Sequence, residues 1–179
     1  MQNPVTYIVA FLMSFIAAQP ALADEIYVGV AVHAIDSPFS METGEGGTDF
    51  QIGYRGDEIE ALSFIGSPSP YVFASINSDG DTNMLAAGIS WKFGDKIYIR
   101  PGIGLAIHDG PSLRIADDGW QTQLGSRVLF EPELSIGVQI SERVDLEASW
   151  VHVSHAGLFN NGQNPGLDNV GLRLVVKLP

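Results

Sequence analysis

The sequence lacks cysteine, has few basic residues and contains no long apolar run. Without cysteine the chain can form no disulfide, no thiolate nucleophile and no cysteine-based zinc site. Lys and Arg number 9 against 21 Asp and Glu, giving a net charge of −12 that argues against a nucleic-acid partner, because few cations could neutralise phosphates. No uncharged apolar run reaches the roughly 18 residues that a transmembrane helix needs.

The chain is nevertheless fairly apolar. Its 179 residues suit one domain of ordinary size, and 45% of them are hydrophobic while only 17% are charged. That charged fraction is low for a protein whose whole surface meets water. The apolar residues must therefore be distributed in some way other than long helical spans.

The first 23 residues have the features of a secretory signal peptide. An apolar block over 7–18 precedes the helix-breaking Pro20 and the small-residue sequence Ala21-Leu22-Ala23, although no Lys or Arg stands before it. Roughly 12 apolar residues are too few to span a membrane as a helix. We expect cleavage after Ala23, which leaves one domain over residues 24–179.

From residue 24 onward, apolar residues alternate with polar or small ones, which is the pattern of β-strands. In most strands one face carries large apolar side chains, and the other carries charged residues mixed with many Gly and Ala. The pattern predicts eight strands, near residues 25–34, 48–55, 70–77, 84–93, 96–107, 127–140, 143–155 and 167–178.

The uniform apolar face indicates an outer surface that meets lipid. Small residues and opposite charges on the other face fit the narrow interior of an eight-stranded barrel. We therefore predict an all-β fold, an eight-stranded antiparallel up-and-down transmembrane β-barrel. Alternation alone does not say where water is, so a soluble lipid-binding barrel or sandwich with the apolar face inside remains an alternative.

The connections between the predicted strands also alternate in length. The links at Gly94-Asp95 and Ser141-Glu142 are short, whereas 34–47, 108–125 and 156–166 are long and rich in Gly, Asp and Asn, as in barrels with short periplasmic turns and longer outer loops. Residues 56–69 break this rule and suggest a small helix or a strand extension.

Aromatic residues are expected to form a belt at each membrane interface. With both termini at the periplasmic end, the outward-facing aromatics divide into two groups. The inner belt is predicted to contain Tyr71, Phe73, Trp91 and Phe93, and the outer belt Phe50, Phe130 and Trp150.

The apolar outer stripe turns polar at the outer end of the last two strands. His152 and Ser154 share a face because they lie two residues apart on a strand, and the register of the next strand puts Asp168 on the same side. A Ser-His-Asp set can act as nucleophile, general base and orienting acid. Ser and His near strand ends commonly have no catalytic role, and that reading stays open here.

The other histidines give no second site. His152 and His155 would point to opposite faces of one strand, so they are poorly placed to share a metal, and we predict no metal site. His33 and His108 are expected in the barrel interior or the loops.

The segment from His152 to Asp168, HVSHAGLFNNGQNPGLD, resembles the C-terminal motif of the outer-membrane lipid A 3-O-deacylase family. The stretches 125–131 and 51–55 are also similar to this family. The resemblance implies an eight-stranded barrel that crosses the outer membrane several times and hydrolyses an ester-linked acyl chain of lipopolysaccharide, without a cofactor.

Carried over residue by residue, the resemblance makes Ser154 the nucleophile, His152 the base and Asp168 the acid, where Glu is commoner. Asn164 matches an asparagine implicated in the oxyanion hole. The expected partners are lipopolysaccharide and outer-membrane lipids, and the resemblance is compatible with a homodimer. A non-enzymatic small barrel with adhesin or structural duties remains the alternative function.

Overall fold

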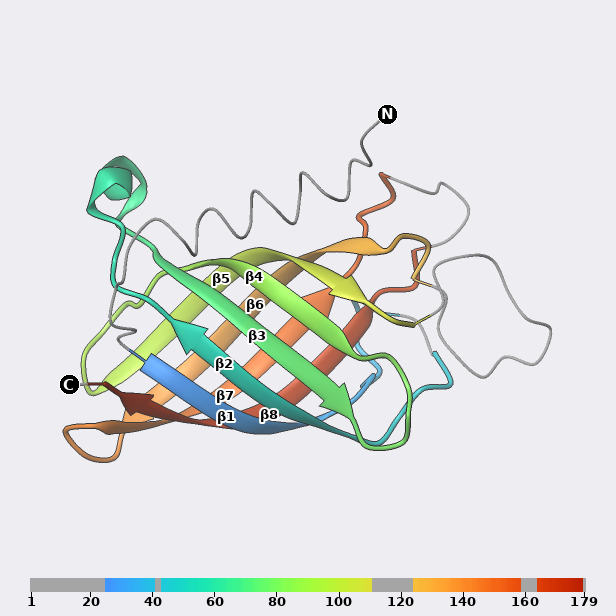
Figure 1. The fold of residues 1–179 in the computed structure, drawn as a ribbon, viewed down its shortest axis with the longest axis horizontal. Helices are drawn as coiled ribbons and strands as arrows, with labels where there is room; N and C mark the ends of the chain where they lie inside the picture. The colour runs from blue at the N-terminus through green and yellow to red at the C-terminus, as the bar shows by residue number, and fades with distance from the viewer. Residues whose placement is uncertain (1–24, 41–42, 111–123, 159–163, 179) are drawn as a thin grey trace.

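The computed structural model describes residues 25–40, 43–110, 124–158 and 164–178, so the predicted signal peptide over 1–23 lies outside the described residues. Eight antiparallel strands close into a barrel in chain order, with β1 paired to β8 (Figure 1). The strands are β1 (Glu25–Val32), β2 (Thr48–Arg55), β3 (Ser69–Asn77), β4 (Met84–Ser90), β5 (Ile97–His108), β6 (Val128–Gln139), β7 (Val144–Val153) and β8 (Leu167–Lys177). The predicted up-and-down barrel is confirmed, with strand ends within a few residues of those expected.

The outer wall of the barrel is apolar. Large aliphatic side chains that alternate along the strands are exposed, among them Ile26, Val28, Ile52, Ile99, Ile136 and Leu172. An exposed apolar surface of this extent is far larger than the scattered patches of soluble proteins. In the part of the chain that the structure describes, no helix is long and apolar enough to cross a membrane. The strands themselves have the polarity of a membrane-spanning barrel.

The interior is filled by paired charges. Arg55 holds Glu147 with two parallel hydrogen bonds of 2.8 and 3.0 Å, and Arg100 lies 3.0 Å from Glu25. Farther along the barrel, the Arg173 guanidinium donates to a Glu133 oxygen at 2.8 Å. All of these groups are buried inside the barrel, away from both lipid and water. Each buried charge has a partner of opposite sign, which offsets the loss of its hydration.

Interior glycines make room for tyrosine rings. A Cβ atom at Gly53 would lie 2.1 Å from the Tyr27 ring, and one at Gly137 would lie 2.2 Å from the Tyr98 ring. Both distances are well below van der Waals contact, so only Gly fits opposite these rings. Part of the high Gly content is therefore a packing requirement of the narrow lumen.

Two members of the predicted inner aromatic belt lie inside the barrel instead. Tyr71 and Phe73 are buried, and the Tyr71 hydroxyl donates to Glu131 while the Arg173 guanidinium lies 5.2 Å from the centre of the Phe73 ring. The prediction of an outward orientation for these two residues is wrong. Both faces of β3 carry apolar residues, so its register follows from the buried Ser75 and Asn77, which share a face with Tyr71 and Phe73.

The two ends of the barrel differ. The loop end carries the connections 33–47, 78–83, 109–127 and 154–166, and the turn end carries 56–68, 91–96 and 140–143. The exception at 56–68 contains a short 3₁₀ helix, η1 (Glu60–Ile65), as one of the two sequence interpretations suggested. The polar positions of β7 and β8 meet at the loop end.

Candidate active site

Antiparallel pairing brings His152 of β7 directly opposite Asp168 of β8. The two residues lie at the loop end, on the face of the strands that also carries Leu146 and Leu172, and therefore on the outside of the barrel. Their side chains are hydrogen-bonded, with His152 Nδ1 2.8 Å from Asp168 Oδ1. A directly paired position lets the short Asp side chain reach the imidazole.

The Asp168 carboxylate is completely covered although it sits on the outer face. Trp150 Nε1 donates to Asp168 Oδ1 at 2.9 Å, and the Ser37 hydroxyl donates to Asp168 Oδ2. Ser37 belongs to the β1–β2 loop, which folds over this side of the barrel. Hydrogen bonds of this kind compensate a carboxylate for its lost hydration, which matters on a surface that faces lipid.

Ser154 continues the outer face beyond the end of β7. Its backbone pairs with Phe130, with N–H to oxygen distances of 2.8 and 3.1 Å, so the strand register extends through it. His152 and Ser154 are therefore two residues apart on one face, as predicted. The structure has no hydrogen bond between these two described side chains. Catalytic hydrogen bonds are often long or poorly aligned before substrate binds.

Asn164 is held by the backbone of the same segment. Its Oδ1 accepts a hydrogen bond of 3.0 Å from the His155 N–H, next to Ser154. Because the carbonyl end of the amide is engaged, the Nδ2 end is directed away from that contact and can donate to another group. The side chain is exposed, so a ligand could reach it.

Aromatic and glycine contacts fix the His152 ring. It is stacked on Trp150 with ring centres 6.0 Å apart, and Phe39 packs against both rings at 6.4 and 5.7 Å. Gly166, with a positive φ of 67°, lies so close that a Cβ there would be 2.8 Å from His152 Cε1. The imidazole therefore has both an indole ring and a glycine backbone next to it.

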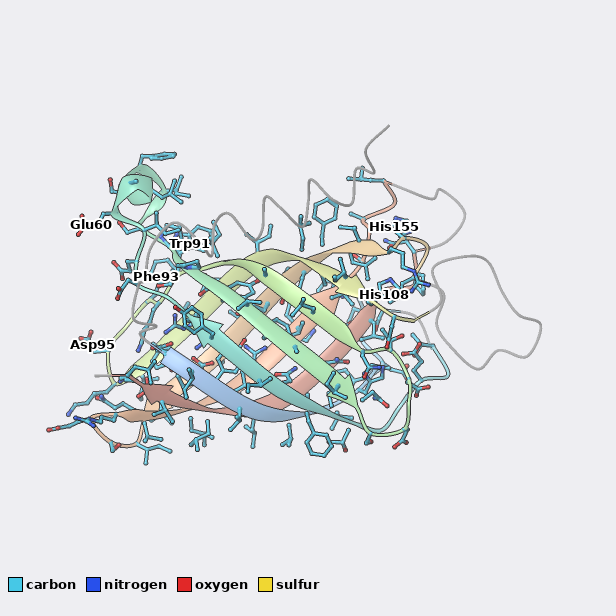
Figure 2. All side chains as sticks on the ribbon, viewed as in Figure 1. Glu60, Trp91, Phe93, Asp95, His108 and His155 are labelled. Atoms are coloured by element: carbon cyan, nitrogen blue, oxygen red, sulfur yellow. The ribbon has the colours of Figure 1, made fainter. Side chains whose placement is uncertain are left out.

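The remaining histidines lie elsewhere. His155 is buried, and among the described residues no group of three or more His, Asp or Glu side chains is arranged to hold a metal. His108 is also buried near the loop end, where its Nε2 lies 2.6 Å from the Ser126 carbonyl oxygen (Figure 2).

His33, the first residue after β1, links the β1–β2 loop to β2. Its ring nitrogens lie 2.8 Å from a Glu45 oxygen and 2.9 Å from an Asp49 oxygen. Burial by itself lowers the pKa of His33, but hydrogen bonds to Asp49 and Glu45 and their charges outweigh it and raise the pKa to about 9. The ring is therefore a charged bridge between two carboxylates at neutral pH.

Sequence reasoning found the His152–Asp168 pair but missed the groups that surround it. Ser37 and Phe39 come from a loop that was noted only for its length, and Gly166 was noted only as part of a motif. Trp150 was assigned to an aromatic belt without its hydrogen bond to Asp168. The only available signal was a strand-end Trp two residues before His152 on the same face.

Comparisons with known proteins found solved structures that are similar to this chain. The crystal structure of the outer membrane enzyme PagL is similar over 85% of this chain and 99% of that one, with a TM-score of 0.59 and 23% identity. The crystal structure of Neisserial surface protein A (NspA) matches over 86% and 96% of the two chains, with a TM-score of 0.48 and 12% identity. No curated protein sequence matches the chain.

The family comparison is more specific than the structural ones. The family model described as lipid A 3-O-deacylase (PagL) matches residues 65–177, a range that includes His152, Ser154, Asn164 and Asp168. This range covers more than half of the chain. The chain therefore belongs to the lipid A 3-O-deacylase (PagL) family.

Proposed function

We propose that the protein is an outer-membrane serine esterase that hydrolyses the 3-O-linked acyl chain of lipid A in lipopolysaccharide. The observation that carries this proposal is the His152–Asp168 hydrogen bond of 2.8 Å on the lipid-facing side of the barrel, with Ser154 on the same face. Family membership supports the substrate, and the apolar outer wall supports a location in the outer membrane.

The roles of the triad follow from its hydrogen bonds. In the neutral imidazole, His152 Nδ1–H donates a hydrogen bond to Asp168, so Nε2 carries the lone pair that can act as a base. In the first step Nε2 takes the hydroxyl proton of Ser154 while the oxygen attacks the ester carbonyl carbon. The developing imidazolium is stabilised by the buried Asp168 carboxylate.

The ester carbonyl oxygen becomes negatively charged as the Ser154 oxygen adds. The amide nitrogen of Asn164 is the donor proposed to stabilise this oxyanion, and such a donor is worth about 3–4 kcal/mol of barrier. Collapse of the intermediate breaks the bond to the sugar oxygen, which leaves as a hydroxyl after taking the proton from His152. Water, activated by the same histidine, then releases the fatty acid from Ser154.

The site suits a substrate that lies in the membrane. An acyl chain bound in the same leaflet can lie along the apolar wall below the site, while its ester reaches the polar residues at the rim. Polar groups facing lipid cost only about 0–1 kcal/mol near the interface but several times more at the midplane. The rim is therefore where both the triad and the ester linkage of lipid A are tolerated.

The direct test is release of fatty acid from purified lipopolysaccharide, measured by mass spectrometry. The protein folded in detergent micelles should release the 3-O-linked chain, and Ser154→Ala should reduce release to the uncatalysed background. Asp168→Asn should lower kcat by on the order of 10⁴-fold, because the imidazole then loses its anionic partner.

Ser149→Ala is the matched control, because Ser149 lies on the same strand with its buried side chain on the opposite face. This variant should keep full activity. Equal release by the protein and by Ser154→Ala, or no release by either, contradicts the proposal and favours a non-enzymatic barrel.

A further inference from the structure

The β2–β3 connection exposes apolar side chains at the turn end. Phe64 in η1 is 80% exposed and Ile65 is 44% exposed, and none of the six residues of this helix is buried. A short connection that only reverses the chain has no need for a helix or for an exposed phenylalanine. The feature therefore calls for a partner that covers these side chains.

The end of η1 is fastened to the outside of the barrel wall. Trp91 Nε1 donates to the Ile65 carbonyl oxygen at 2.8 Å. Gly66 ends the helix with a φ of 94°, and a Cβ there would lie 3.4 Å from Trp91 Cδ1. Trp91 is in the alternating series of Leu85 and Phe93, which face outward. The connection thus folds against the lipid-facing side of the wall.

The arrangement in space agrees with these contacts. Figure 1 shows η1 projecting sideways from the wall at the turn end, away from the barrel mouth. In Figure 2, Trp91 and Phe93 lie at the same end of the barrel as η1, and Glu60 points away from the barrel. Phe93, two residues after Trp91 on the same face, and Ile97 in β5 are 56% and 73% exposed, so the wall at this end of the barrel is apolar as well.

We propose that η1 is an interfacial anchor that inserts Phe64 and Ile65 into the phospholipid leaflet at the turn end. Short helices with an apolar side and a charged side bind at this depth of a bilayer, and Trp is favoured there as well. The exposed Asp57, Glu58 and Glu60 would stay in water. The inference rests on the membrane location given in the proposed function but not on the chemistry of the site.

The charge of the β2–β3 connection indicates which kind of lipid headgroup it can approach. Residues 56–69 contain three acidic residues and no Lys or Arg, so attraction to anionic headgroups cannot drive binding. Insertion must depend on apolar contact, and a zwitterionic phospholipid surface is the partner that fits.

Site-directed spin labelling can test the anchor in the complete folded chain. Because the sequence has no cysteine, Phe64→Cys creates a single labelling site. In phosphatidylcholine vesicles the label at position 64 should be relaxed more by oxygen, which concentrates in lipid, than by a water-soluble nickel complex. Glu60→Cys in the same helix should give the opposite preference, and Ile97→Cys on the wall provides the lipid-exposed reference.

Nickel accessibility at position 64 equal to that at position 60 overturns the anchor, whether the side chains then meet water or a soluble protein. Spectral narrowing when labelled protein is diluted with unlabelled protein identifies a second copy as the occupant and also overturns it. A water-exposed label at Ile97 would instead contradict the membrane location itself. Repeating the labelling in Ser154→Ala should change nothing, which separates the anchor from the esterase proposal.

Discussion

At the scale of single residues, Asp168 organises the site. Its two oxygens accept hydrogen bonds from His152, Trp150 and Ser37, which come from β7 and from the β1–β2 loop. These hydrogen bonds restrict the orientation of the carboxylate, and the carboxylate in turn fixes the orientation of the imidazole. Small changes next to this group should therefore affect activity more than folding.

Gly166→Ala should reduce kcat/KM by about 100-fold, because the new methyl group would displace the His152 ring from its position. Gly157→Ala is the control. Gly157 has a similar positive φ of 72°, but a Cβ there meets nothing within 4 Å, so it reproduces the backbone strain alone. Fatty-acid release by both variants would be measured under identical conditions, and equal activities would disprove the steric argument.

Ser37→Ala should lower kcat by about 10-fold, because a hydrogen bond to a charged group contributes about 1.5–3 kcal/mol. Ser37→Thr keeps the hydroxyl and should retain most of the activity. Ser78→Ala removes a hydroxyl from the β3–β4 loop and should have no effect on fatty-acid release. An active Ser37→Ala variant would show that Asp168 does not need this donor.

At the scale of the strands, alternation separates an apolar wall from an ionic interior. The arginines at positions 55, 100 and 173 each lie close to a buried glutamate. Rings of Tyr27 and Phe73 pack on the Arg173 guanidinium at 4.8 and 5.2 Å, which adds cation–π contacts. The strands are thus joined through the lumen as well as along their edges.

Arg173→Met should destabilise the barrel by about 3–5 kcal/mol, because Glu133 would remain buried without its partner. Urea unfolding followed in lipid vesicles measures this loss. Arg143→Met, on the exposed β6–β7 turn, is the control and should change stability little. Adding Glu133→Gln to Arg173→Met should recover part of the stability, and a lack of recovery would mean that packing rather than charge causes the loss.

At the scale of the whole molecule, the loop end is tied together by a charged histidine. His33 follows β1, Asp49 lies in β2, and Glu45 also accepts a hydrogen bond of 2.9 Å from Thr82 in the β3–β4 connection. The β1–β2 and β3–β4 connections and strand β2 therefore meet around one imidazolium. Loss of its proton should loosen the rim that carries the site.

Stability should depend on pH through this group. The folded pKa of about 9 is above the ordinary value of 6.5, so the contribution of His33 is complete below about pH 6.5 and is lost as pH rises through 9. Urea midpoints between pH 6 and 10 should fall over this window. The same curve for His33→Gln should lack this component, and identical slopes for both proteins would contradict the assignment.

Most of the fold could be predicted from the sequence because strand alternation is strong wherever one face is uniformly apolar. The prediction of side-chain orientation was wrong at Tyr71 and Phe73, because both faces of β3 are apolar there. Only the neighbouring Ser75 and Asn77 indicate the register of this strand. The connection at 56–68 could be recognised from the sequence as unusual. The hydrogen bond between Trp91 and η1 could not be predicted, because no sequence pattern relates Trp91 to this connection.

By itself the sequence determined the eight strands, the inside-out polarity and the facing pair of His152 and Asp168, since all three follow from period-2 alternation and the order of neighbouring strands. The tertiary structure alone decided what covers the pair. Ser37 is 131 residues away from Asp168 along the chain, and contacts across such a separation depend on how the closed barrel brings β1 beside β8.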